Sequence, residues 1–179
     1  MPVHIALMRG INVGGNHILP MKDLRAMFED AGATAVRTYI QSGNVIFEAP
    51  ARAATALVRN VTTRVEDERG FGVPVVLRSA SQLDAVLEAN PFPKAAAEPK
   101  FLHVAFADRK PTAAAAAKLD PDRSPPDRFQ VQGREIYLHY PGGAARSKLT
   151  VDYLERTLAV TVTIRNWRTT TKLRDLAAG

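Results

Sequence analysis

The sequence predicts an α+β protein built from two ferredoxin-like (βαββαβ) subdomains, each an antiparallel sheet with helices on one face. Three observations predict this fold class. The same order of strand-like and helix-like segments occurs twice along the chain, although the side chains themselves do not repeat. A stretch rich in proline and alanine, PFPKAAAEPK at 91–100, separates the two copies. The length of 179 residues, with 46% hydrophobic and 23% charged residues, suits one globular domain or two small ones.

The first subdomain is predicted over residues 1–90, with an extra helix at its end. Apolar runs predict its strands, and apolar residues spaced by three and four predict its helices. Pro20 suits the first turn of a helix that Gly32 ends, and Ser79 with Gln82 forms a capping box before the extra helix. The predicted order is a strand at 3–8, a helix at 20–32, strands at 36–40 and 45–47, a helix ending near 70, a strand at 73–77 and a helix ending near 90.

After the predicted linker at 91–100, the second subdomain is predicted over residues 101–179. Five consecutive alanines predict a helix, QGRE at 132–135 predicts a hairpin turn, and Asn166 can cap the last helix. The predicted order is a strand at 101–106, a helix at 111–119, a proline-rich loop at 120–126, strands at 129–131 and 136–140, a helix at 149–158, a strand at 160–164 and a helix at 167–177.

Charge is distributed unevenly along the chain. Residues 1–90 hold 9 Lys/Arg and 9 Asp/Glu, whereas residues 91–179 hold 15 and 9, so the whole net charge of +6 lies in the second half. A cationic surface attracts anions, so the expected partner is a phosphate-containing small molecule or a nucleic acid. The absence of cysteine excludes a disulfide scaffold and a thiolate metal site and is compatible with the cytoplasm, and no apolar run is long enough to cross a membrane. We expect no metal and no cofactor, because the four histidines lack metal-ligand spacing.

Two glycine-rich loops of the first subdomain are expected to meet. Strands one and two of a ferredoxin-like unit run parallel, so the loop after the first strand, RGINVGGN, shares an end of the sheet with the hairpin turn QSGN. RGINVGGN is neither a dinucleotide-binding fingerprint nor a phosphate-binding P-loop. Two interpretations stay open: a wide turn that needs positive φ, or a polar ligand site. The candidate residues are Arg9, Asn12, Gly14, Gly15, Tyr39, Gln41, Ser42 and Asn44.

A stronger phosphate-binding signal lies in the second subdomain. Two of its strands end at one edge of the sheet, and their exits, PGGAARSK and RNWR, each lead into a helix N-terminus that carries unpaired N–H donors. Basic residues beside such donors form an anion site. Trp167 is expected to anchor the last helix, with stacking on a ligand as the alternative. The candidate residues are Gly142, Gly143, Arg146, Ser147, Lys148, Arg165, Asn166, Trp167 and Arg168.

Several of these segments also carry a family resemblance. The chain resembles, from end to end, the family catalogued as domain of unknown function 1697, through LMRGINVGGN with the following P-M-x-x-L, TYIQSGNVIF, NPFP, PGGAARSKL and TIRNWRTTTKL. The resemblance implies two ferredoxin-like subdomains. It implies no reaction and no residue roles, so whether the protein is an enzyme stays open.

Three functional hypotheses follow. The leading one is a cytoplasmic protein that binds an anionic ligand through the basic helix N-termini of the second half. The second is an enzyme that acts on a small polar substrate at the RGINVGG and QSGN loops, with Arg9 and Asn12 orienting an oxyanion and Tyr39 as an acid. The third is a protein-interaction module that uses Trp167 and an exposed sheet face.

Overall fold

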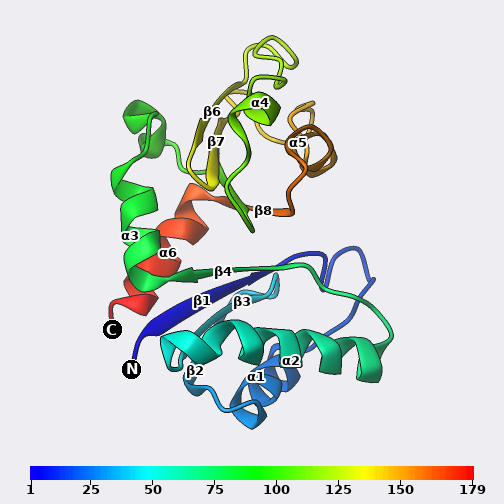
Figure 1. Ribbon diagram of the computed structural model, residues 1–179. Helices are drawn as coiled ribbons and strands as arrows, with labels where there is room; N and C mark the ends of the chain where they lie inside the picture. Colours follow the sequence, from blue (N-terminus) through cyan, green and yellow to red (C-terminus); the bar gives the residue numbers. More distant parts are fainter. The chain divides into compact units, whose positions relative to one another are not determined.

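The computed structural model describes residues 1–179, which divide into two compact units (Figure 1). The first unit comprises residues 1–83 and 173–179, and the second comprises residues 84–172. The boundaries fall within two helices, α3 (Ala80–Glu88) and α6 (Trp167–Ala177). Each unit contains one four-stranded sheet.

In the first unit, the strands lie in the order β2-β3-β1-β4, and all neighbours are antiparallel. Helices α1 and α2 cover one face of this sheet (Figure 1). The core that they form with the sheet includes Met8, Phe28 and Phe47. The elements are β1 (Val3–Met8), α1 (Met21–Asp30), β2 (Thr34–Tyr39), β3 (Asn44–Glu48), α2 (Ala51–Arg69) and β4 (Val75–Ser79).

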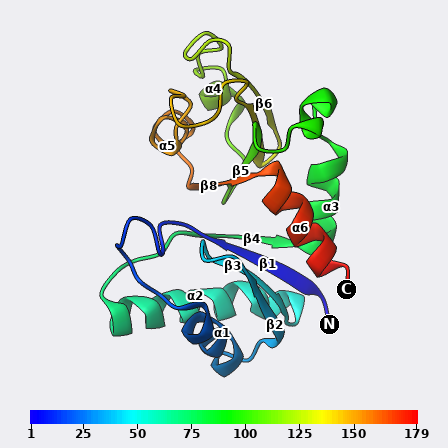
Figure 2. The same ribbon diagram turned by 180° about the vertical axis from the view of Figure 1, so that it is seen from behind.

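In the second unit, the strands lie in the equivalent order, β6-β7-β5-β8, again antiparallel throughout. Figure 2 shows α4 and α5 on one side of this sheet, where the core includes Leu138, Tyr140 and Leu154. The predicted fold class, α+β with two sheets of ferredoxin-like order, is therefore confirmed. The elements are the 3₁₀ helix η1 (Pro93–Ala97), β5 (Leu102–Ala107), α4 (Ala113–Ala116), β6 (Arg128–Gln132), β7 (Glu135–His139), α5 (Val151–Leu158) and β8 (Val162–Asn166).

The helix ends carry the capping residues that the sequence predicts. The Ser79 backbone N–H donates to the Gln82 side chain over 2.9 Å, and the Gln82 N–H donates to Ser79 Oγ over 3.2 Å, which completes the capping box of α3. Asn166 Oδ1 accepts the Thr169 N–H over 2.8 Å at the start of α6. Gly70 ends α2 with a φ of +80°.

The alanine-rich helix predicted at 111–119 is much shorter than expected. Regular α-helix covers only Ala113–Ala116, and the chain then tightens into i→i+3 bonds from Lys118 to Ala115 and from Leu119 to Ala116. Leu119 is the one strongly buried residue at this end, at 5% exposed. Alanine has high helix propensity but offers little surface to bury, so the packing of Leu119 decides the geometry here.

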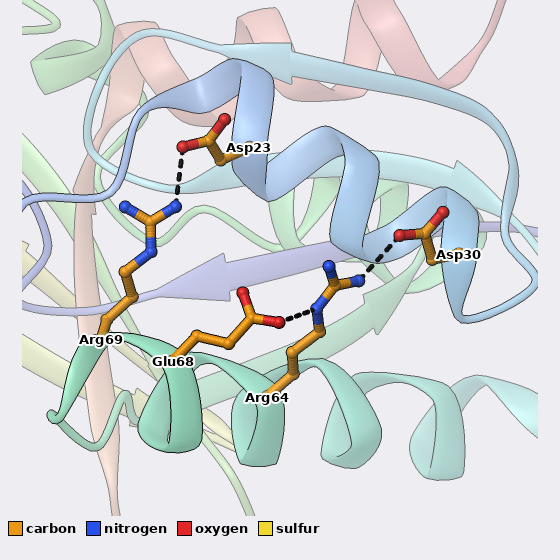
Figure 3. Close-up of polar contacts among 5 residues, drawn as sticks. All are labelled: Asp23, Asp30, Arg64, Glu68 and Arg69. Carbon is orange, nitrogen blue, oxygen red and sulfur yellow. Dashed lines mark hydrogen bonds and ion pairs between the residues drawn. The ribbon is translucent and has the colours of Figure 1, made fainter.

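Ion pairs connect the exposed sides of α1 and α2 (Figure 3). Arg69 donates to Asp23 over 2.7 Å, and Arg64 donates to Asp30 over 2.8 Å and to Glu68 over 2.6 Å. The hydrogen bonds that Arg64 donates to Asp30 and Glu68 raise its pKa above the ordinary value. Because these side chains are partly exposed to solvent, each pair contributes little to stability.

None of the helices has the length and apolar character that crossing a lipid bilayer requires.

Candidate functional site

The two glycine-rich loops of the first unit meet, as the topology predicts. The Met8 backbone N–H at the end of β1 donates to the Gly43 carbonyl over 2.9 Å. The Asn12 side chain donates to the Gln41 carbonyl over 2.9 Å. The QSGN turn is therefore bound to the end of β1 by the Met8–Gly43 bond and to RGINVGGN by the Asn12–Gln41 bond, whose two residues are 29 positions apart in the sequence.

The glycines of the first loop form the tip of a small hairpin. Gly14 and Gly15 have φ angles of +58° and +75°, and the Asn16 N–H donates to the Val13 carbonyl over 2.9 Å. Positive φ at both central residues is typical of a two-residue hairpin turn. These are the positive φ angles that the turn interpretation of Gly14 and Gly15 requires.

The Asn12 amide holds this loop in place. Its Oδ1 accepts the Leu19 N–H over 2.8 Å, and its Nδ2 donates to the Leu19 carbonyl over 2.8 Å and to the Gln41 carbonyl over 2.9 Å. Both ends of the amide are thus engaged by backbone groups. Asn12 itself has a φ of +54°, which asparagine tolerates better than most residues. These contacts give Asn12 a structural role.

Asn44 and Arg9 are two further candidate residues at the end of the sheet where the two loops meet. Asn44 is fully buried and donates to the Tyr39 carbonyl over 3.0 Å and to Ser42 Oγ over 3.2 Å, so it shapes the hairpin turn. Arg9 is half-buried, and its backbone N–H donates to the Pro74 carbonyl. Three large apolar side chains are exposed here: Val13 in the first loop, Ile18 just after it and Ile40 just before QSGN.

In the second unit, β7 and β8 end at the same edge of the sheet, as predicted, because Leu102 of β5 pairs with His139 and His103 pairs with Asn166. The loop that follows β7, PGGAARSK, is hydrogen-bonded at its last residue to Arg123 and Ser124. Arg123 donates to the Lys148 carbonyl over 2.9 Å, and the Lys148 N–H donates to Ser124 Oγ over 3.0 Å. The Arg146 and Lys148 side chains are exposed.

The predicted anion cluster is only partly exposed. Arg165 is 8% exposed and donates to Thr163 Oγ1 over 2.7 Å and to the Ile164 carbonyl over 3.1 Å, and burial lowers its pKa to about 10. Trp167 is buried, at 9% exposed, which leaves little of its ring for stacking. Arg168 is exposed. The first turn of α5 is capped by Thr150, as that of α6 is by Asn166.

A groove that the sequence did not predict lies beside residues 91–101, and we call it the 91–101 groove. It consists of two adjoining hollows of about 270 and 260 Å³. Both hollows are lined by Lys94, Ala95 and His139. The first hollow is further lined by Pro91, Phe92, Pro93 and Arg128, and the second by Glu98, Phe101 and Pro141. Each is near the lower end of the size range of small-molecule sites.

Local structure positions the groove's side chains. Asn90 Oδ1 accepts the Phe92 N–H over 2.9 Å, which fixes the chain as it leaves α3. Arg128 and His139 are directly paired across β6 and β7. The Phe92 ring centroid lies 5.9 Å from that of His139 and 5.5 Å from Arg128 Cζ. Aromatic rings and a guanidinium are therefore adjacent in the first hollow.

The charges that line the groove are Lys94, Arg128 and Glu98, together with the titratable His139. None of Lys94, Arg128 and Glu98 takes part in an ion pair. The first hollow contains both cations and no carboxylate. This hollow is suited to an anion.

The structure contains no group of three or more His, Asp or Glu side chains that are arranged to hold a metal ion. Burial lowers the pKa of His103 to about 4, and its ring packs edge-on against Tyr140 at 5.0 Å. His103 is therefore a neutral group of the sheet at pH 7.

The sequence does not predict the groove, because a stretch rich in proline and alanine such as 91–100 is typical of a linker. Two signals were available. An aromatic residue between two prolines, Phe92, needs a surface to pack on. The predicted hairpin around Gly133 also implies that Arg128 and His139 are cross-strand neighbours.

The model of the family described as "Protein of unknown function (DUF1697)" matches residues 1–137. Among solved structures, the fold is similar to that of a conserved bacterial protein, SP0830 from Streptococcus pneumoniae, with a TM-score of 0.74. The two share 22% sequence identity, and the match covers 100% of this chain and 99% of that chain. At this identity the likeness concerns the fold alone. None of the curated proteins matches the chain.

Proposed function

Because the chain belongs to the DUF1697 family, whose description assigns no activity, we propose a function from the geometry: the protein binds a small anionic molecule, such as a phosphorylated metabolite, in the 91–101 groove. The supporting observation is a hollow that contains two cations without ion-pair partners, Lys94 and Arg128, and no carboxylate. The proposal keeps the anionic ligand expected from the charge of the second half. It moves the main contacts from the helix N-termini to the groove.

The chemistry of the hollow supports a phosphate or carboxylate ligand. A guanidinium donates through a planar fork that matches these anions, and a lysine adds a compact charge. Pro91, Phe92 and Pro93 are apolar residues that line the same hollow, and the Phe92 ring lies beside the Arg128 guanidinium. A cytoplasmic location belongs to the same proposal and is compatible with the absence of cysteine.

Replacing Arg128 by glutamine should weaken the binding of inorganic phosphate or pyrophosphate about tenfold, because one charge-assisted hydrogen bond is lost. Binding is measured from backbone amide shifts of residues 91–101 and 139–141 in NMR titrations. The matched control is Arg146→Gln, which removes the same charge from an exposed residue of the PGGAARSK loop. We expect the control to bind like the wild type.

The opposite pattern would contradict this placement. If Arg146→Gln weakens phosphate binding and Arg128→Gln does not, the site lies at the loop that the sequence predicted. If neither anion shifts any of these amides at millimolar concentration, the groove is no anion site. Thermal unfolding of each variant verifies that the fold is retained.

A nucleic acid is the second candidate, favoured by the excess of cations in the second half. Its signature is a steep fall of log affinity with log salt, with a slope beyond about −2 for three phosphate contacts. Arg168→Gln, at an exposed residue, should then flatten that slope. Arg165 is unsuitable for this test because it is buried and hydrogen-bonded. Affinity for oligonucleotides that is independent of salt would exclude this candidate.

A further inference from the structure

The two hollows of the 91–101 groove differ in charge, and this difference describes the ligand. The first hollow holds Lys94 and Arg128 with no acid, whereas the second holds Lys94 and Glu98. The Glu98 carboxylate would repel a second anionic group in the second hollow. A neutral group that donates hydrogen bonds would instead be paired with that carboxylate.

The walls of the second hollow favour a flat, unsaturated group. They include the Phe101 ring and Pro141, with His139 shared between the hollows. Aromatic side chains are surfaces on which nucleic-acid bases stack.

We propose that the ligand is a nucleotide whose base carries an amino group: its phosphate lies in the first hollow near Lys94 and Arg128, and its base lies in the second hollow, where Glu98 accepts the amino hydrogens. This inference rests on the proposed anion-binding function and specifies its ligand. A carboxylate accepts well from an exocyclic amino group. Guanine offers an amino group and a ring N–H side by side, so it matches a carboxylate with two oxygens best. Uracil presents carbonyl oxygens on both sides of its N–H and is disfavoured.

The test compares GMP with IMP, which lacks only the 2-amino group, by isothermal titration calorimetry on the full chain. We expect GMP to bind about tenfold more tightly than IMP, and UMP to bind weakly. In Glu98→Gln this preference should shrink to about twofold, while inorganic phosphate binds no more weakly than to the wild type, because a negative charge near Lys94 is removed. Glu98 is exposed and its side chain makes no hydrogen bond, so this substitution should leave the fold intact.

Phosphoethanolamine supplies a phosphate and an amine without a ring and tests whether the aromatic walls matter. Equal affinity for phosphoethanolamine and GMP would overturn the assignment of a nucleotide. Equal affinity for GMP and IMP, unaffected by Glu98→Gln, would overturn the role of Glu98. In both cases the proposed function survives as long as inorganic phosphate binds and Arg128→Gln weakens it. If neither phosphate nor any nucleotide binds, the proposed function fails as well.

Discussion

Replacing Gly43 by alanine is expected to lower the free energy of unfolding by about 3 kcal/mol. Gly43 has a φ of +86°, and a Cβ there would lie 2.8 Å from Met8 Cβ and 2.8 Å from Ile11 Cδ1. Met8 belongs to β1 and is fully buried, so its Cβ cannot move without displacing the strand. The expected loss combines left-handed backbone strain with overpacking, and urea denaturation followed by circular dichroism measures it.

The matched control for this substitution is Gly14→Ala. Gly14 has a φ of +58°, but a Cβ there would meet no atom within 4 Å. The only cost is that alanine adopts a positive φ less readily than glycine, which lowers the free energy of unfolding by about 1 kcal/mol. If both variants lose the same stability, the close approach of the QSGN turn to β1 does not exist in solution.

Replacing Asn12 by alanine is expected to cost about 2–3 kcal/mol, because the substitution removes three hydrogen bonds and leaves backbone groups of Leu19 and Gln41 without partners. The left-handed conformation of residue 12 adds to the cost, since alanine adopts it less readily than asparagine. NMR amide shifts should change at both Leu19 and Gln41, which are 22 residues apart in the numbering.

Asn16→Ala is the control, because the exposed Asn16 side chain makes no hydrogen bond. Its unfolding free energy should stay within about 0.5 kcal/mol of the wild type. Wild-type stability in Asn12→Ala would contradict the structural role. It would favour the hypothesis that the amide serves a substrate, because a residue held only for binding contributes little to stability.

Local signals in the sequence predicted most of the fold correctly. Hydrophobic periodicity, the capping box of Ser79 with Gln82 and the end of α2 at Gly70 all involve residues within a few positions of each other. The predicted strand at 73–77 is displaced to Val75–Ser79, because Pro74 has no N–H to contribute to the sheet. Where packing of one side chain decides the geometry, as at Leu119, local propensity was insufficient.

For the candidate sites, local patterning was enough to predict the element order, and the topology then implied which loops share an edge of the sheet. The meeting of RGINVGGN with QSGN and the common exit of β7 and β8 follow from strand direction alone. Three features could be learned only from the folded chain: the hydrogen bonds of the Asn12 amide, the burial of Arg165 and the proximity of Phe92 to Arg128 and His139. The physical reason is that strand order follows from local patterning, whereas burial and hydrogen-bond partners depend on packing between residues far apart in the chain.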